Sequence, residues 1–172
     1  MARALFLGRF QPPHSGHLHA IQTASEEFDE VLVVVGSAQA SYTSVDPFTA
    51  GERIEMLDAA LEEAGVRNAR VFPLVDLGRH AQWVAYVESL VPPFDAVVTN
   101  NPLTRLLFEA SDYEVVNVEL HRRRECSGTR IRKALAKGND VSDAVPTAVD
   151  RILKRLDATR RLALLAEDED GS

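Results

Sequence analysis

The stretch ALFLGRFQPPHSGH, residues 4–17, joins a short apolar run to a turn rich in glycine and proline. The run at residues 4–7 ends at Gly8, which predicts a buried β-strand. Over residues 17–28 the apolar positions recur with helical spacing, so a helix is expected directly after the turn. A strand that leads straight into a helix is the first half of a β-α-β unit, which favours a parallel sheet.

The rest of the chain repeats this alternation of apolar strands and amphipathic helices. Thr49 and Glu52 form a capping-box pattern at one helix start, and Gly65 follows the end of that helix. Strands are expected at residues 31–35, 69–75, 96–99 and 115–118, and helices at residues 49–63, 81–90 and 127–135, after Pro102, and from Pro146 to about Leu164. The sequence therefore predicts an α/β fold: a Rossmann-like open parallel sheet of about five or six strands with helices on both faces, plus C-terminal helices.

Length, charge and cysteine content limit the classes of protein to consider. The 172 residues predict one domain at residues 1–166, followed by an acidic tail at 167–172. The single cysteine, Cys126, excludes a disulfide within the chain and a thiolate metal cluster, and it fits a reducing compartment. No signal-peptide pattern and no apolar run near the ~20 residues of a membrane span are present, so we expect a soluble cytoplasmic protein without a membrane partner. The net charge of −7 argues against a nucleic-acid partner, but a few local arginines suffice for a nucleotide site.

Four segments are expected to meet at one edge of the sheet. Ligands of open parallel sheets bind at the carboxyl ends of the strands, where the strand order reverses. This rule places residues 8–17, 36–48, 76–83 and 99–102 on the same rim. Residues 37–48 follow neither a helical nor a strand period, and loops of that length in compact domains are often functional.

The segment after the first strand predicts a phosphate site. Gly8 would let a phosphate approach the backbone without a side chain in the way. His14, Gly16 and His17 open the first helix, whose amides and positive dipole end favour an anion. The alternative is that both histidines only bond to local backbone. No Rossmann dinucleotide fingerprint or Walker A sequence is present. The His-x-Gly-His pattern resembles the signature of the nucleotidyltransferase superfamily.

A second motif lies after the fifth expected strand. Ser127-Gly128-Thr129-Arg130-Ile131-Arg132 resembles the Ser-x-Thr-x-Ile-Arg motif of the same superfamily. Ser127 and Thr129 offer hydroxyls and amides at a helix start, and Arg132 adds a fixed positive charge. Together they are expected to hold the β- and γ-phosphates of a nucleoside triphosphate.

Further segments, in order along the chain, are similar to one branch of that superfamily. Residues 8–12 (GRFQP), 36–39 (GSAQ), 46–53 (DPFTAGER), 83–84 (WV), 87–95 (VESLVPPFD) and 101–103 (NPL) look like archaeal nicotinamide-nucleotide adenylyltransferase, a match that extends to about Leu165. The resemblance implies that AMP passes from ATP to nicotinamide mononucleotide (NMN), which gives NAD and pyrophosphate. It also implies a substrate-bound divalent metal, usually Mg²⁺, and a homo-oligomer, commonly a hexamer.

The resemblance assigns roles to individual residues. His14, His17, Arg9 and Arg132 are expected to be catalytic, and Trp83 to stack on the nicotinamide ring. The expected ATP-binding residues are Gly8, Arg9, Phe10, Gln11, His14, Gly16, His17, Asn101, Ser127, Gly128, Thr129, Arg130 and Arg132. The expected NMN-binding residues are Phe10, Ser37, Gln39, Phe48, His80 and Trp83, and no protein metal ligand is expected. The chain departs from the family pattern at His80, where asparagine is frequent, and at Tyr42, where histidine is common.

The expected chemistry is direct. The 5′-phosphate of NMN attacks the α-phosphorus of ATP in line, pyrophosphate leaves, and no covalent intermediate forms. The nucleophile is already an anion, so the protein needs only to align the partners and neutralise charge. Alternatives remain: a related adenylyl- or cytidylyltransferase with another phosphorylated acceptor, a non-catalytic nucleotide sensor, and a core tryptophan in place of a stacking one.

Overall fold

The computed structural model describes residues 1–117 and 126–170 of the chain. The strands are β1 (Arg3–Gly8), β2 (Glu30–Val35), β3 (Ala69–Pro73), β4 (Ala96–Val98) and β5 (Glu114–Val116). The helices are α1 (Ser15–Glu27), α2 (Ala50–Glu63), α3 (Trp83–Leu90), α4 (Pro102–Glu109), α5 (Gly128–Ala136), α6 (Thr147–Arg155) and α7 (Ala158–Asp170), with a 3₁₀ turn, η1 (His80–Gln82), before α3.

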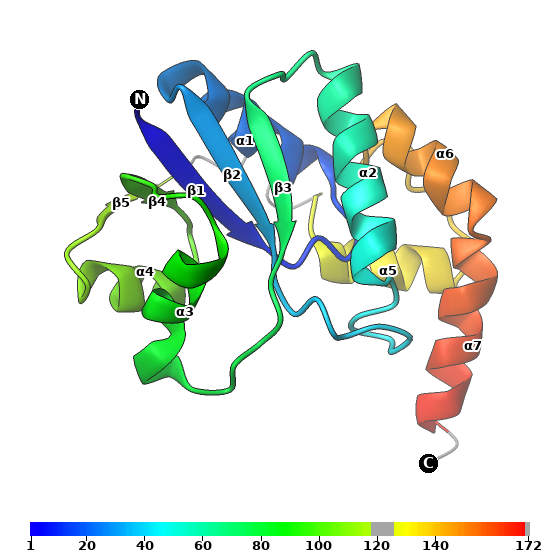
Figure 1. Cartoon of the computed structure of the whole chain (residues 1–172). Helices are drawn as coiled ribbons and strands as arrows, with labels where there is room; N and C mark the ends of the chain where they lie inside the picture. Colours follow the sequence, from blue (N-terminus) through cyan, green and yellow to red (C-terminus); the bar gives the residue numbers. More distant parts are fainter. Residues whose placement is uncertain (118–125, 171–172) are drawn as a thin grey trace.

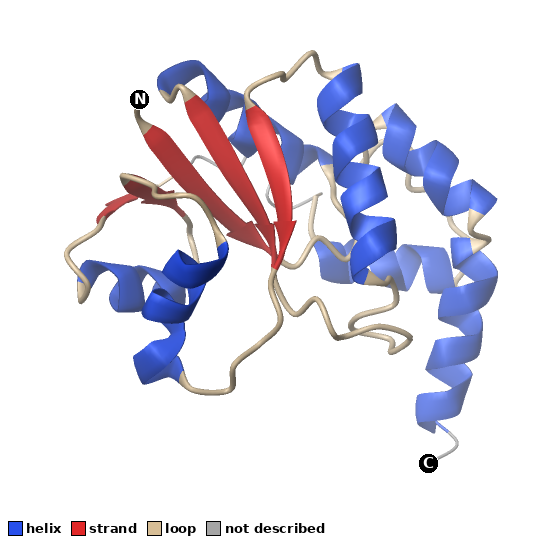
Figure 2. Ribbon diagram, in the orientation of Figure 1, coloured by secondary structure: helices blue, strands red, loops and turns tan. Residues whose placement is uncertain are grey.

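Within these residues the five strands form one open parallel sheet in the order β3-β2-β1-β4-β5 (Figures 1 and 2). The register pairs Leu5 of β1 with Leu32 of β2 on one side and with Val97 of β4 on the other. The predicted α/β class and its parallel sheet are confirmed. Val118, the last residue of the fifth expected strand, lies outside the described residues.

Alternate side chains of the central strands enter two different cores. Ala4 and Phe6 of β1 pack with α1 and α2 in one hydrophobic cluster. Leu5 of β1 and Leu32 of β2 pack in a second cluster with α3 and α4 on the opposite face. Figure 1 shows α1 behind strands β1 to β3. A strand of a parallel sheet is covered on both faces, so its sequence is a continuous apolar run. These strands could be predicted from such runs.

The C-terminal helices form a third cluster, and here one prediction was wrong. The single helix expected from Pro146 to about Leu164 is two helices, α6 and α7, separated at Asp157, which has a φ of 50°. Ala158 comes nine residues after Val149, which is roughly two and a half helical turns, so a continuous helix would place the two on opposite sides. Both are buried in the same cluster, and the break makes this possible.

Candidate active site

The strand order reverses between β1 and β4, because the chain leaves β1 toward β2 and β3 and reaches β4 only afterwards. Two cavities open beside the carboxyl ends of these strands. The histidine cavity, of about 340 Å³, is lined by His14, His17, Thr99, Asn101, Ser127 and Gly128, among others. The tryptophan cavity, of about 560 Å³, is lined by Arg9, Ser37, Asp76, His80, Trp83 and Asn101, among others. The four segments predicted to share one rim therefore do so, and Asn101 lines both cavities.

His14 and His17 are locked together by a reciprocal cap at the start of α1. The Nδ1 atom of His14 accepts the backbone N–H of His17 at 3.3 Å, and the Nδ1 atom of His17 accepts the backbone N–H of His14 at 3.2 Å. Their rings stack with centroids 3.6 Å apart. A Cβ on Gly16 would lie 3.1 Å from the His14 ring, so glycine leaves room for this arrangement.

The cap decides which ring nitrogen carries the proton. A nitrogen that accepts an N–H has no proton of its own, so the hydrogen bonds assign the neutral tautomer with its proton on Nε2 to both rings. Burial lowers the pKa of His14 from 6.5 to about 4. Burial, with a smaller contribution from His14, holds the pKa of His17 well below its usual range. At neutral pH the pair thus offers two uncharged Nε2–H donors.

The simpler interpretation of these histidines is confirmed, and it leaves phosphate binding as a prediction. They do bond to local backbone, as the simpler alternative proposed, but only through Nδ1. The second nitrogen of each ring remains for a ligand, and both rings line the histidine cavity.

Gly8 has a structural role in addition to the one predicted. A Cβ there would lie 2.8 Å from the ring of Phe10, so the ring fills the space that a side chain would need. Phe10 is 1% exposed and touches the His17 ring edge-on, with centroids 4.7 Å apart. The Phe10 ring therefore packs against His17, and Gly8 leaves room for that ring. The Phe10 side chain offers a ligand almost no surface.

Gln11 and Phe48 also act inside the protein. The Gln11 amide donates to the Phe48 carbonyl and accepts its N–H, both at 3.0 Å. The Phe48 ring is fully buried in the C-terminal cluster. The structure thus does not bring the Phe48 ring to the tryptophan cavity. The two hydrogen bonds from Gln11 hold the backbone of Phe48, at the end of the loop that leads into α2.

Both arginines predicted to be catalytic feel the charge of one carboxylate, that of Asp46. Arg9 donates to both oxygens of Asp46, and its half-exposed side chain lines the tryptophan cavity. Arg132 donates to the Gln11 carbonyl at 2.9 Å and to Thr129 Oγ1 at 3.3 Å. Burial lowers the pKa of Arg132, and the charge of Asp46 opposes that effect. Asp46, for which the sequence assigned no role, therefore shapes the electrostatics around both arginines.

The helix start after the second motif borders the histidine cavity. Ser127 caps α5 by accepting the N–H of Arg130 at 3.3 Å. Ser127 and Gly128 line the cavity, whereas Thr129 and Arg130 are exposed. An added Cβ on Gly128 would lie 2.8 Å from Arg132 Nη1, so glycine admits the guanidinium.

The tryptophan cavity has one aromatic wall and several polar groups. The half-buried Trp83 ring meets Phe108 edge-on, with centroids 5.6 Å apart, and also faces the cavity. His80 is exposed on η1 at the same wall. Gln39 is not among the lining residues, but its amide donates to Asp76 Oδ2 at 2.9 Å and accepts the Asp76 N–H at 3.0 Å. It therefore holds a carboxylate at the cavity edge.

Two further observations concern the part of the chain that the structure describes. None of its groups of histidine, cysteine and acidic side chains is arranged to hold a metal ion with three or more ligands. None of its helices combines the length and the apolar character that crossing a membrane requires.

Comparisons with known proteins agree with this geometry. The cytidylyltransferase-like family matches residues 5–134. Nicotinamide-nucleotide adenylyltransferase of Picrophilus torridus is 45% identical over 168 residues, covering 98% of this chain and 99% of the relative. The enzyme of the same name from Archaeoglobus fulgidus is 42% identical over 165 residues, covering 93% and 95%.

Solved structures show the same fold at lower identity. A bifunctional NMN adenylyltransferase/ADP ribose pyrophosphatase from Francisella tularensis superposes with a TM-score of 0.80 at 20% identity, over 98% of this chain and 53% of that one. The chain therefore belongs to the cytidylyltransferase-like family and, within it, to the nicotinamide-nucleotide adenylyltransferase family of nucleotidyltransferases.

Proposed function

We propose that this chain transfers AMP from ATP to the 5′-phosphate of NMN, which gives NAD and pyrophosphate. The observation that carries the proposal is the junction at Asn101 of two unlike cavities. One presents two neutral N–H donors and a helix start, which suit phosphates. The other has an aromatic wall, which suits a flat base. Such an arrangement holds a triphosphate and a mononucleotide end to end.

In the proposed reaction an oxygen of the NMN phosphate forms a bond to the α-phosphorus of ATP. The bond from that phosphorus to the bridging β-oxygen breaks, and its electron pair leaves with pyrophosphate. No proton has to be removed from the nucleophile. His14 and His17 cannot serve as bases, because Nδ1 is engaged and Nε2 is protonated. They are instead suited to donate hydrogen bonds to charge that builds on the phosphate oxygens.

The arginines supply the permanent positive charge. We propose that Arg132, with Arg130 nearby on α5, binds the leaving pyrophosphate, and that Arg9, which lines the tryptophan cavity from the loop after β1, adds charge there. Trp83 is proposed to stack on the nicotinamide ring, with His80 and Ser37 beside it.

The donor set fits a divalent cation held by the substrate rather than by a protein cage. Mg²⁺ held by a protein usually binds carboxylates, and the described residues that line the histidine cavity include no aspartate or glutamate. A solved relative from Francisella tularensis is complexed with AMP and a manganese ion. In this chain, Mg²⁺ bound by ATP oxygens and water would neutralise phosphate charge, and the residues named above would orient the phosphates.

The remaining expectations concern assembly and compartment. We propose a cytoplasmic homo-oligomer, with the hexamer that the resemblance implies. The exposed leucines Leu103 and Leu106 of α4 give such an assembly an apolar surface to bury. Light scattering on a size-exclusion column measures the mass in solution, and a monomer at micromolar concentration would refute this part of the proposal.

The function is tested by incubating the protein with ATP and Mg²⁺ and each of several acceptors. The panel contains NMN, nicotinic acid mononucleotide and phosphopantetheine, and the readouts are pyrophosphate release and the mass of the product. NAD formation with NMN is expected. A product with phosphopantetheine alone would assign the chain to the related adenylyltransferases, and ATP binding without any product would make it a nucleotide sensor.

A further inference from the structure

Arg53 is a fully buried charged residue that no part of the proposed chemistry uses. It lies in the first turn of α2, within the DPFTAGER segment, and its burial lowers its pKa. An arginine side chain has five N–H donors in a fixed planar fork. A guanidinium is kept out of water only where those donors find acceptors. The identity of its acceptors therefore indicates what Arg53 does.

All five donors reach backbone carbonyls. Nη1 donates to the carbonyls of Arg9 and Gly36, both at 2.9 Å. Nη2 donates to those of Ser37 and Ala40 at 3.1 and 3.4 Å, and Nε donates to that of Thr49 at 3.2 Å. One side chain thus joins the loop after β1, the loop after β2 and the start of α2.

The hydrogen bonds of Arg53 begin where the pairing of β1 with β2 ends. At the end of these two strands, the Gly36 N–H donates to the Gly8 carbonyl at 2.9 Å. Beyond it, the carbonyls of Arg9 and Gly36 share one nitrogen of Arg53. The two loops are therefore held at a fixed separation after their strands stop pairing.

The two peptide groups that Nη1 holds lead into unusual backbone. Phe10 and Ser37, which follow Arg9 and Gly36, have φ values of 54° and 48°. Side chains other than glycine adopt this left-handed region at a cost, and surrounding contacts must maintain it. The C=O and N–H of a trans peptide point in opposite directions, so the N–H groups of Phe10 and Ser37 point away from Arg53. The guanidinium thus orients both residues.

We propose that Arg53 is a positioning residue for the transfer reaction, one that holds the loop carrying Arg9 and the loop carrying Ser37 in the alignment in which the two substrates meet. This inference rests on the proposed function. Arg53 touches no substrate in this scheme. Arg9 and Ser37 line the tryptophan cavity from the loops after β1 and β2, and Arg53 holds both loops through the carbonyls of these two residues.

Lysine is the informative replacement. It keeps the charge and three donors, but they radiate from one nitrogen and cannot reach all of the five carbonyls. We expect Arg53→Lys to fold with a lowered melting temperature. Its kcat/KM should fall by ~100-fold, because small misplacements of reacting groups are that costly.

The matched control is Leu57→Ala, one turn further along α2. Leu57 is buried in the core cluster that also contains Phe10, and its apolar side chain forms no hydrogen bond to either loop. Both variants are assayed well below their melting temperatures. Leu57→Ala should retain kinetic constants within a few-fold of the parent despite its lost stability. An Arg53→Lys variant equally close to the parent would overturn the proposal, and so would equal losses in both variants.

A second variant covers failure of the lysine variant to fold. Arg53→Gly leaves a cavity of the shape of the lost side chain, and millimolar methylguanidinium should restore activity at least tenfold, whereas methylammonium should not. Restoration by both cations, or by neither, would refute the positioning role.

A readout without turnover separates this inference from the proposed function. Amide NMR shifts of Phe10 and Ser37 should both move in Arg53→Lys, whereas that of Ser37, which lies outside the cluster of Leu57, should stay in place in Leu57→Ala. If the parent protein makes no NAD while these shifts behave as expected, the proposed function fails and the positioning of the loops stands. If the parent makes NAD and neither shifts nor kinetics change in Arg53→Lys, only the role of Arg53 is overturned.

Discussion

The histidine cavity and the tryptophan cavity share Asn101 but are built in different ways. The capping groups of the first are fixed by neighbours in the sequence, since His14 and His17 cap each other and Ser127 caps the helix that it opens, although the segments that line this cavity lie far apart in the chain. The second is assembled from the ends of several strands, and its loops are held by long-range contacts such as Arg161 to Pro47. Local hydrogen bonds fix the donors proposed for phosphate, whereas long-range contacts hold the loops of the cavity proposed for the base.

The largest expected effect breaks the locally built cavity. His17→Ala should lower kcat by ~100-fold or more, because the developing charge loses a hydrogen-bond donor. The same change also removes the Nδ1 acceptor of the His14 N–H, so alanine alone mixes two roles. His17→Asn retains an acceptor near the Nδ1 position and lacks Nε2–H. Steady-state kinetics should find both variants equally impaired, with His17→Asn the more stable. An active His17→Asn would show that Nε2 is not needed.

A pH experiment examines the same pair through stability. The folded-state pKa of His14 lies below its ordinary value, so the unfolded chain binds more protons between pH 6.5 and about 4. Its stabilising contribution is complete above pH 6.5 and is lost as the pH falls toward 4. The full difference from 6.5 to about 4 corresponds to about 3 kcal/mol.

Denaturant unfolding at pH 8, 6 and 4.5 measures this effect. His14→Asn keeps a helix-capping side chain without a titrating ring, so its free energy of unfolding should fall less across the series than that of the parent. Parallel curves for the two proteins would remove the buried histidine as the cause of acid sensitivity.

The third effect belongs to the tryptophan cavity. Trp83→Ala should raise the KM for NMN by ~10-fold or more, the effect of losing one stacked base, and should change the KM for ATP much less. Trp83→Phe is the control, because it keeps an aromatic face toward the cavity. Equal increases in both Michaelis constants would show that Trp83 acts through its contact with Phe108 rather than on the nicotinamide ring.

The same contrast explains what the sequence alone predicted. Apolar periodicity located the strands and helices, and Thr49, Pro102 and Ser127 marked helix starts that the structure has. The break at Asp157 was missed because only the third cluster shows that Val149 and Ala158 must face the same way. The two motifs could be found because each is contiguous in the sequence, and residues of both line the histidine cavity.

Long-range partners left no comparable pattern. Nothing in the sequence says that Gln11 holds Phe48, or that five carbonyls from three segments converge on Arg53. Phe10 and Phe48 were expected at the mononucleotide, yet their rings are buried, since aromatic residues in a motif serve packing and binding alike. A charged residue inside an apolar helix face was the one available signal for Arg53.

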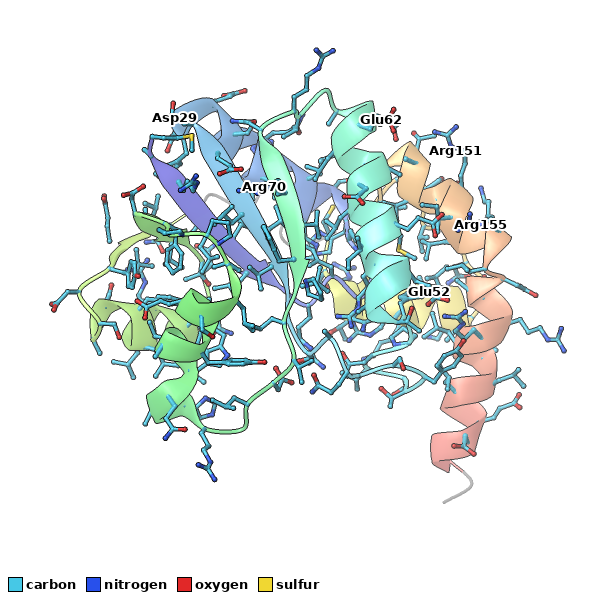
Figure 3. The ribbon with its side chains drawn as sticks, viewed as in Figure 1. Asp29, Glu52, Glu62, Arg70, Arg151 and Arg155 are labelled. Atoms are coloured by element: carbon cyan, nitrogen blue, oxygen red, sulfur yellow. The ribbon has the colours of Figure 1, made fainter. Side chains whose placement is uncertain are left out.

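The smallest expected effect concerns α7, which holds a loop beside the tryptophan cavity. Arg161 of α7 pairs with both oxygens of Glu52, at 2.7 and 2.9 Å, donates to the Pro47 carbonyl at 3.2 Å, and lies over the Tyr42 ring. Figure 3 shows Glu52 at the lower end of α2, on the side of α7. The ion pair is mostly buried, so it tethers the end of the loop that begins at Ser37.

Arg161→Ala should therefore raise the KM for NMN by ~3-fold, with little change in the KM for ATP, because a loosened loop costs less than a lost contact. The control is Arg155→Ala, which removes an exposed ion pair between α6 and Glu55 of α2; Arg155 is labelled in Figure 3. Exposed pairs of this kind contribute ~1 kcal/mol or less, so its kinetics should match the parent. If both variants behave alike, or if the KM for ATP rises as much as that for NMN, α7 does not support the tryptophan cavity. Arg53 would then be the more distant of the residues that hold its loops in place.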